Sequence, residues 1–437
     1  MKNTPVNPDI VNKIIADCGL KSVGNASIRE IVKVVSQIEV ASGIKFIRME
    51  MGVPGLNSTT IGVQAEIEAL KNGVSSIYPN MEGLPALKTE TSRFIKNFMN
   101  IDVQHQGCVP TVGSMQGSMA AIMVANKCAP GKNKTLFIDP GFPVQKVQCK
   151  TLGISYETFD IYNFRGVKLK DKLNSIFAKG DISSVIYSNP NNPSWICFTE
   201  EELKIIGEAA NEHDIIVIED LAYFGMDFRI NISNPGEPPF QPSVANYTDN
   251  YILLISSSKV FSYAGQRLGM LVMSDKIFKR DYHNLLPFFS CTDFGHAIIY
   301  GALYALSAGT AHSTQYALAA MFRAANDGKF KFIDDVKPYG ERAEIMKKLF
   351  LDNGFYLVYD KDGNKPLADG FYFTINYPGF TGAKLLEELL YYGIGSIALS
   401  ITGSEHEGLR ACVSQFHSEQ TQHLKERLEI FKENHPV

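Results

Sequence analysis

The sequence predicts an α/β fold, with a three-layer large domain around a mostly parallel central sheet and a smaller α+β domain. From residue 108 onward, short apolar segments alternate with helical patterns, which is typical of repeated strand–helix units. These segments are apolar throughout, as expected for parallel strands that are covered on both faces. Past Lys276 the alternation stops, and 437 residues exceed the size of one compact core, so a second domain is expected.

The N-terminal part is predicted to be mainly helical. Residues 24–42 carry apolar side chains at the spacing of a helix. A strand-like segment at 44–51 ends in a glycine- and proline-rich turn at 52–55. Two more helices are expected, over 61–72 and 84–97.

Four apolar runs in the middle of the chain are predicted to be strands, each ended by a turn or a polar residue. They span 134–138, 184–188, 214–218 and 250–255. A helix is expected over 115–128, behind a loop of glycine and serine. Because ligands of such sheets bind beyond the carboxyl ends of the strands, we expect functional residues directly after these runs.

The C-terminal part is predicted to be mainly helical over 277–330 and then an α+β unit. Its expected helices and strands are 332–353, 355–359, 370–376, 385–392, 408–414 and 418–433. We therefore expect a large domain over 55–320. The remaining segments, 1–54 and 321–437, are expected to form the small domain.

Composition excludes several classes of protein. A net charge of −4 gives no electrostatic reason to expect nucleic acid or a membrane surface as a partner. Neither a signal peptide nor a membrane-spanning segment is expected. The seven cysteines are scattered without C-x-x-C spacing and the nine histidines form no cluster, so neither a disulfide framework nor a metal site is expected. The reducing cytoplasm is the predicted compartment.

The segment Ile255–Gly269 places a lysine and an arginine directly after an apolar strand. Desolvation at the end of a buried strand lowers the pKa of a lysine, which makes the amine of Lys259 available as a nucleophile or base. The forked, permanently charged Arg267 suits a phosphate. Taken alone, this segment is equally compatible with an ordinary surface turn.

Other residues with chemical potential follow the remaining strands. The loop 111–118 offers backbone amides at the start of a helix, where an anion such as phosphate binds well. Phe142 can stack on an aromatic ring, and Asn192 holds an amide in a stiff turn between prolines. Asp220 is a buried carboxylate that needs a partner, such as a cationic ring nitrogen, and Tyr223 can donate a hydrogen bond. Each of these residues alone is as readily structural.

Taken together, these residues match what pyridoxal 5′-phosphate requires. Its phosphate needs amides, hydroxyls and an arginine, and its ring nitrogen needs a carboxylate. Its ring oxygen needs hydrogen-bond donors, and its aldehyde needs a lysine that forms a Schiff base. The sequence supplies these groups in chain order on successive strand ends.

From about Ser27 to Val413 the sequence resembles the class I/II aminotransferases of the fold-type I pyridoxal-phosphate enzymes. The resemblance rests on three motifs: Ser256-Ser257-Ser258-Lys259 followed by Arg267 and Gly269, Asn189-Pro190-Asn191-Asn192-Pro193, and Asp220-Leu221-Ala222-Tyr223. It implies an aminotransferase-like fold in which the large domain, 55–320, binds the cofactor. The implied activity moves an amino group between an L-amino acid and a 2-oxo acid.

The resemblance also assigns roles to individual residues. Lys259 would form the Schiff base and move the proton, Asp220 would hold the ring nitrogen protonated, and Phe142 would stack on the ring. Asn192 and Tyr223 would contact the ring oxygen. The expected phosphate ligands are Gly113, Ser114, Met115, Ser256, Ser258 and Arg267.

Three further residues are implied at the substrate and at a subunit interface. Gly52 and Arg410 would contact the substrate, together with Asn192, and the fork of Arg410 would hold its α-carboxylate. Tyr78 fits the tyrosine that reaches the phosphate of a neighbouring subunit. The resemblance therefore implies a homodimer whose active sites are shared across the interface.

Two residues depart from the family pattern, and other activities compete with the implied one. Trp195 stands where glycine is usual, and Met115 replaces a residue that is often polar. A C–S β-lyase of the same fold is the main alternative, and a non-catalytic, cofactor-binding regulator is the other. Residues 287–295 contain no arginine, which favours a neutral or aromatic substrate side chain, although Arg229 and Arg280 remain possible contributors.

Overall fold

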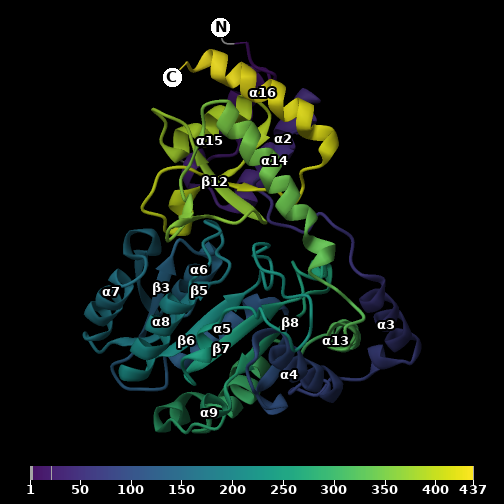
Figure 1. The fold of residues 1–437 in the computed structure, drawn as a ribbon, viewed down its shortest axis with the longest axis vertical. Helices are drawn as coiled ribbons and strands as arrows, with labels where there is room; N and C mark the ends of the chain where they lie inside the picture. Colours follow the sequence, from purple (N-terminus) through teal and green to yellow (C-terminus); the bar gives the residue numbers. More distant parts are fainter. Residues whose placement is uncertain (1–2, 21, 437) are drawn as a thin grey trace.

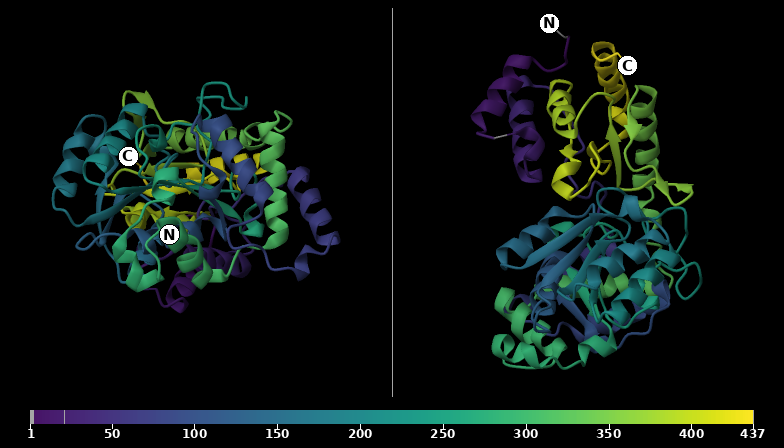
Figure 2. Two further views of the ribbon diagram at one scale, coloured as in Figure 1. Left: turned by 90° about the horizontal axis from the view of Figure 1, so that it is seen from below. Right: turned by 90° about the vertical axis from the view of Figure 1, so that its left-hand side faces the viewer.

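The computed structural model describes residues 3–20 and 22–436 of the chain. Figure 1 shows a large domain built around a central sheet and a small domain that contains both ends of the chain. The views in Figure 2 show the small domain seated on one edge of the large one. This arrangement agrees with the predicted pairing of an α/β domain with a smaller α+β domain.

A seven-stranded sheet with the order β2-β8-β7-β6-β5-β3-β4 forms the centre of the large domain. All its strand pairs are parallel except those of β8 with β2 and with β7, so the sheet is mostly parallel, as predicted. The strands are β2 (Cys108–Thr111), β3 (Lys134–Asp139), β4 (Ser155–Asp160), β5 (Ile182–Ser188), β6 (Ile216–Leu221), β7 (Tyr251–Ser256) and β8 (Gly269–Met273).

Helices cover both faces of this sheet, which gives the predicted three layers. Alternate strand residues serve different cores: Ile218 and Leu254 belong to one apolar cluster, whereas Val217 and Leu253 belong to the other. One face is covered by α5 (Gly113–Ala125), α6 (Pro143–Thr151) and the π-helix η8 (Ala297–Leu303). The other core receives side chains of α4 (Pro85–Met99), α7 (Lys168–Phe177), α8 (Glu200–Glu212) and α13 (His312–Asn326).

The large domain contains further helices, and Ile277 and Phe294 from two of them are fully buried in its core. These helices are α3 (Thr60–Lys71), α9 (Asp275–Phe278), α10 (Leu286–Phe289), α11 (Phe294–His296) and α12 (Tyr304–Ser307).

The small domain contains a four-stranded antiparallel sheet of order β14-β15-β12-β9. Its strands are β9 (Tyr356–Leu357), β12 (Tyr372–Asn376), β14 (Ile397–Ala398) and β15 (Leu409–Cys412). Two small pairs accompany it: β1 (Ile47–Arg48) with β13 (Ile394–Gly395), and β10 (Lys361–Asp362) with β11 (Lys365–Pro366). Its helices are α1 (Pro8–Asp17), α2 (Ile28–Ser42), α14 (Pro338–Asp352), α15 (Gly382–Tyr391) and α16 (Thr421–Asn434).

Several predicted elements differ in extent from those in the structure. The strand expected over 44–51 shortens to β1, because only two of its residues pair with β13. The helix expected from residue 332 begins at Pro338, which occupies the first turn, where a missing N–H costs no hydrogen bond. The stretch 277–330 is broken into short helices before α13. Some elements of the structure were not predicted: helices α1 and α7, and strands β4, β8, β10, β11, β13 and β14.

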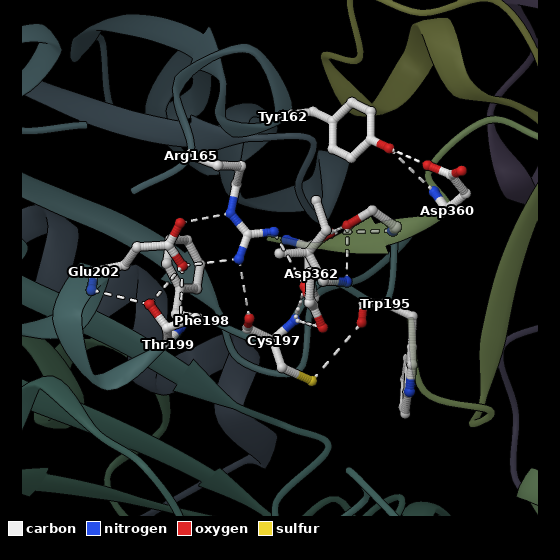
Figure 3. A network of polar contacts seen from close by, with 12 residues as sticks. Tyr162, Arg165, Trp195, Cys197, Phe198, Thr199, Glu202, Asp360 and Asp362 are labelled. Atoms are coloured by element: carbon white, nitrogen blue, oxygen red, sulfur yellow. Dashed lines mark hydrogen bonds and ion pairs between the residues drawn. The ribbon is translucent and has the colours of Figure 1, made fainter. Parts of the chain in front are cut away.

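A buried polar network joins the two domains (Figure 3). The Asp362 carboxylate, on the β10–β11 hairpin of the small domain, forms ion pairs with Arg165 at 3.0 Å and Arg229 at 2.8 Å. It also accepts hydrogen bonds from the backbone N–H of Cys197. Burial raises the pKa of Asp362, and the two guanidinium groups oppose that effect. The small domain is thereby fixed to the turn that carries Trp195.

Candidate active site

A cavity of about 780 Å³ is lined by residues of both domains and lies at the carboxyl ends of the parallel strands. It is large enough for a cofactor and a small substrate. Twelve of the residues predicted for the site line this cavity. They are Gly52, Ser114, Met115, Phe142, Asn192, Asp220, Tyr223, Ser256, Ser258, Lys259, Arg267 and Arg410.

One end of the cavity is built to hold an anion. Gly113 has a φ of +67°, and a Cβ there would lie 2.5 Å from Nη2 of Arg267, so the backbone approaches the guanidinium directly. Ser114 follows in the first turn of α5, whose free N–H groups favour negative charge. Ser256 and Ser258 adjoin them at the end of β7. This end of the cavity suits a phosphate.

Lys259 lies three residues beyond the end of β7, as the sequence predicts. Its Nζ donates a hydrogen bond to the carbonyl oxygen of Gly52. Burial, with Arg410 and Arg267 nearby, lowers the pKa of this amine to about 8. About one tenth of the Lys259 amine is therefore uncharged, and so available as a nucleophile, at pH 7.

Asp220, in β6, is a buried carboxylate that pairs with no cation in the part of the chain that the structure describes. Its oxygens accept hydrogen bonds from the Gln145 side chain at 2.8 Å and from the backbone N–H of Ala222 at 3.1 Å. Burial raises the pKa of Asp220 to about 6, although both hydrogen bonds lower it. A protonated ring nitrogen would supply the positive charge that this carboxylate lacks.

Arg410, in β15, is only 1% exposed. Its guanidinium donates to the carbonyl oxygen of Glu50 at 2.7 Å and to Oδ1 of Asn192 at 3.4 Å. Its buried Nε has no hydrogen-bond partner among residues 3–20 and 22–436. Since the guanidinium retains donor capacity and lines the cavity, it is suited to a carboxylate ligand.

Trp195 is fully buried behind the cavity wall, with a φ of +64°. Its indole packs edge-on against Tyr223, with ring centroids 5.3 Å apart. It also fills the space over Gly370, where a Cβ would lie 2.0 Å from the indole. The departure from the family pattern therefore closes the junction between the domains and leaves the cavity open.

Two predicted site residues lie outside the cavity. Gly113 sits directly behind Arg267, as described above, whereas Tyr78 is 91% exposed on the surface of the large domain. Arg280 pairs with Asp214 at 2.6 Å and Arg229 pairs with Asp227 at 2.8 Å, so neither lines the cavity of this subunit.

The sequence analysis missed other lining residues. They include Ile28, Arg29, Val53, Pro54, Val144, Gln145, Ser188 and Tyr372. Gln145 stands three residues after Phe142, one helical turn along α6, and this spacing was the available signal. No comparable signal marks Tyr372, because it lies in a strand that is buried throughout.

Within residues 3–20 and 22–436, no group of histidine, cysteine or acidic side chains is arranged to hold a metal ion. The same part of the chain contains no helix long and apolar enough to cross a membrane. All seven cysteines are unpaired.

The solved structures to which the fold is similar include aminotransferases. The alanine aminotransferase of Pyrococcus furiosus matches with a TM-score of 0.74 and 20% identity, over 94% of this chain and 98% of that one. An aspartate aminotransferase double mutant of Thermus thermophilus matches with a TM-score of 0.73 and 14% identity, over 93% and 96% of the two chains. At these identities the likeness supports the fold.

Sequence relatives point the same way. The probable aspartate aminotransferase of Methanocaldococcus jannaschii is 25% identical over 355 residues, which cover 75% of this chain and 87% of that protein. Nicotianamine aminotransferase 1 of Oryza sativa subsp. japonica is 27% identical over 225 residues, 51% of this chain and 43% of that protein.

A lysine, an unpaired buried aspartate and an anion-binding end in one cavity fit the class of pyridoxal-phosphate-dependent enzymes. Residues 46–428 match the family of class I and II aminotransferases, and the chain belongs to this family. The protein is thus a transferase that uses pyridoxal phosphate to exchange amino groups between amino acids and 2-oxo acids.

Proposed function

We propose that Lys259 is the residue that links to the cofactor and moves the proton in this amino-group exchange. The supporting observation is the meeting of three groups in one cavity: the Lys259 amine with its lowered pKa, the Asp220 carboxylate without a cation, and Arg410 with an unpaired Nε. Pyridoxal phosphate supplies an aldehyde and a ring that takes up electrons.

The other residues of the chain bind and orient. Arg267, Ser256, Ser258 and the start of α5, from Gly113 to Met115, hold the phosphate. Asp220, itself held by Gln145, holds a positive charge on the ring nitrogen. Phe142 would cover one face of the ring, and Asn192 and Tyr223 would hold the ring oxygen. Lys259 lies close to Gly52, so its amine can carry a proton to and from the α-carbon of a substrate held there.

Arg410 and Gly52 bind the substrate, with the guanidinium on the α-carboxylate. The side chain of the substrate meets a mainly apolar wall that includes Val53, Met115 and Val144. This wall favours a neutral or aromatic amino acid. Arg29 is the one further arginine among the described residues that line the cavity, and it lies exposed at its edge.

We also propose that the protein is a homodimer with shared active sites. Tyr78 and Ile77 are largely exposed, and so are Tyr300 and Tyr304 of η8 and α12. Exposed aromatic and large apolar residues of this kind are typical of subunit interfaces. In the dimer, Tyr78 reaches the phosphate bound by the neighbouring subunit.

The domain division at 55–320, with 1–54 and 321–437 forming the small domain, is part of the same proposal. The packing of α13, which ends at Asn326, against α3 and α4 of the large domain supports a boundary shortly after residue 320. The cytoplasm is the proposed compartment, and the seven unpaired cysteines support it.

A titration of the holoenzyme with a panel of amino acids tests the proposed activity. We expect neutral or aromatic amino acids to bleach the cofactor absorbance, and a 2-oxo acid to restore it. Steady release of ammonia and pyruvate without an added acceptor would instead indicate C–S lyase activity. A strong preference for aspartate or glutamate would contradict the proposed substrate class.

A further inference from the structure

Tyr372 lies in the cavity between Tyr223 and Arg410, and the mechanism above gives its hydroxyl no task. It is the first residue of β12 and is 2% exposed. Tyr372 pairs with Cys412 of β15, and Thr374 pairs with Arg410. Since side chains alternate along a strand, Tyr372 and Arg410 project from the same face of the small sheet as diagonal neighbours.

Close contacts fix the position of the Tyr372 side chain. The guanidinium carbon of Arg410 lies 4.6 Å from the centre of its ring, a cation–π contact. A Cβ at Gly52 would lie 2.4 Å from its hydroxyl oxygen, so only glycine lets this backbone pass. Trp195 packs edge-on against the ring at a centroid distance of 6.1 Å. The hydroxyl is therefore held beside both the carboxylate-binding arginine and the glycine that contacts Lys259.

The hydrogen bond between the two tyrosines limits what each hydroxyl can do. Tyr223 donates to the Tyr372 oxygen at 2.8 Å. Burial raises the pKa of both phenols, so each keeps one proton at neutral pH. In this arrangement Tyr223 uses its proton in the hydrogen bond to Tyr372. The proton of Tyr372 is available to another acceptor.

We propose that the Tyr372 hydroxyl is a further substrate-binding group, which donates to the α-carboxylate held by Arg410 and competes with the cofactor ring oxygen for the proton of Tyr223. This proposal rests on the function proposed above. The carboxylate is the anionic acceptor that Arg410 brings to this part of the cavity. The Tyr372 hydroxyl would thus contact both the substrate carboxylate at Arg410 and the Tyr223 hydroxyl beside the cofactor.

The competition has a measurable consequence for the cofactor. Negative charge on the ring oxygen would favour a proton on the nitrogen that joins Lys259 to the cofactor, and a hydrogen bond donated to that oxygen would weaken this attraction. When Tyr372 accepts the hydrogen bond of Tyr223, the ring oxygen receives less of it and attracts the proton on that nitrogen more strongly. Tyr372 therefore raises the pH at which the visible absorbance of the holoenzyme titrates.

The Tyr372→Phe holoenzyme tests both parts, because it keeps the ring against Arg410 and Trp195 and removes only the hydroxyl. We expect its KM for amino acids, and its dissociation constant for the unreactive carboxylate isovalerate, to rise about tenfold or more, as for a lost hydrogen bond to a charged group. The absorbance titration is expected to move to lower pH, since Tyr223 then donates to the ring oxygen alone.

The matched control is Tyr377→Phe, one residue beyond the end of β12. Tyr377 is 1% exposed, and its hydroxyl donates to the backbone oxygen of His435, away from the cavity. This variant should change neither isovalerate binding nor the titration. Unchanged isovalerate affinity in Tyr372→Phe would overturn the carboxylate contact, and an unmoved or raised titration would overturn the competition. Either result would leave the proposed amino-group exchange of the wild type unaffected. If the wild type carried out no amino-group exchange, both the proposed function and the proposal for Tyr372 would be wrong.

Discussion

The two halves of the active site are built in different ways. Asp220 and Lys259, on the cofactor side, come from the ends of the neighbouring strands β6 and β7 in one sheet. Gly52, Tyr372 and Arg410, on the substrate side, come from three distant segments that meet through the small domain. The first half depends on local strand-end positions, whereas the second depends on how the domains pack. Cofactor chemistry and substrate binding should therefore separate in variants.

The largest effect is expected at the centre of the cofactor side. Lys259→Ala removes the only lysine among the described residues that line the cavity, and with it both the nucleophile and the proton carrier. We expect kcat/KM to fall on the order of 10³-fold or more. Steady-state kinetics with the best amino acid measures this. Turnover at the normal rate would refute the assignment of Lys259.

The next effect is expected on the substrate side. Arg410→Lys keeps the charge but loses the planar fork, so a carboxylate is held by fewer hydrogen bonds. We expect KM to rise by roughly 10²-fold, equivalent to about 3 kcal/mol, with a smaller change in kcat. If kcat fell while KM stayed constant, Arg410 would act in the cofactor half of the site, and its assignment to the substrate half would be wrong.

A smaller effect is expected at the phosphate end. Arg267→Gln removes a charged donor beside Gly113 and should weaken cofactor binding by about tenfold or more. Once the site is saturated with cofactor, KM for the amino acid should be close to that of the wild type. Equilibrium dialysis of the cofactor measures the first quantity. Cofactor affinity equal to that of the wild type would exclude Arg267 as a phosphate ligand.

The smallest effect concerns the stability of the cofactor-free protein. The pKa of Asp220 is about 6 in the folded chain, above its ordinary value of 3.8, so the folded state binds the proton more tightly. Proton binding by Asp220 therefore stabilises the folded chain fully below pH 3.8. This stabilisation is lost as the pH rises through about 6. When the pH is raised from 5 to 8, the free energy of unfolding of Asp220→Asn should therefore increase by about 1–2 kcal/mol relative to that of the wild type.

Urea denaturation of both cofactor-free proteins at the two pH values measures this difference. Comparison with the wild type at each pH cancels the titration of other buried acids, such as Glu219 and Asp139. A stability difference that does not change with pH would show that Asp220 has an ordinary pKa in the folded chain.

The cofactor side could be predicted from the sequence because its residues stand directly beyond apolar strands. Asp220 is among the last two residues of β6, and Lys259 lies three residues after β7. A parallel sheet brings the carboxyl ends of such strands to one edge. The mostly parallel sheet was predictable for the same reason. Strand β8 was missed, since its five residues follow the Arg267 loop without an intervening helix.

The substrate side could be predicted only in part. Arg410 and Gly52 were assigned by family resemblance, but Tyr372 lies in β12, where every residue is buried and no alternation marks the face towards the cavity. The departure at Trp195 was visible in the sequence. Its accommodation was not, because it depends on the missing side chain of Gly370, far along the chain.

The most direct test of this division is to measure two affinities of the Arg410→Lys protein side by side. Cofactor binding is followed by absorbance, and isovalerate binding is followed by the change it causes in that absorbance. The division predicts a cofactor affinity equal to that of the wild type and a loss of isovalerate affinity by about tenfold or more. An equal loss of both affinities would contradict it, because the two halves of the site would then not be separable.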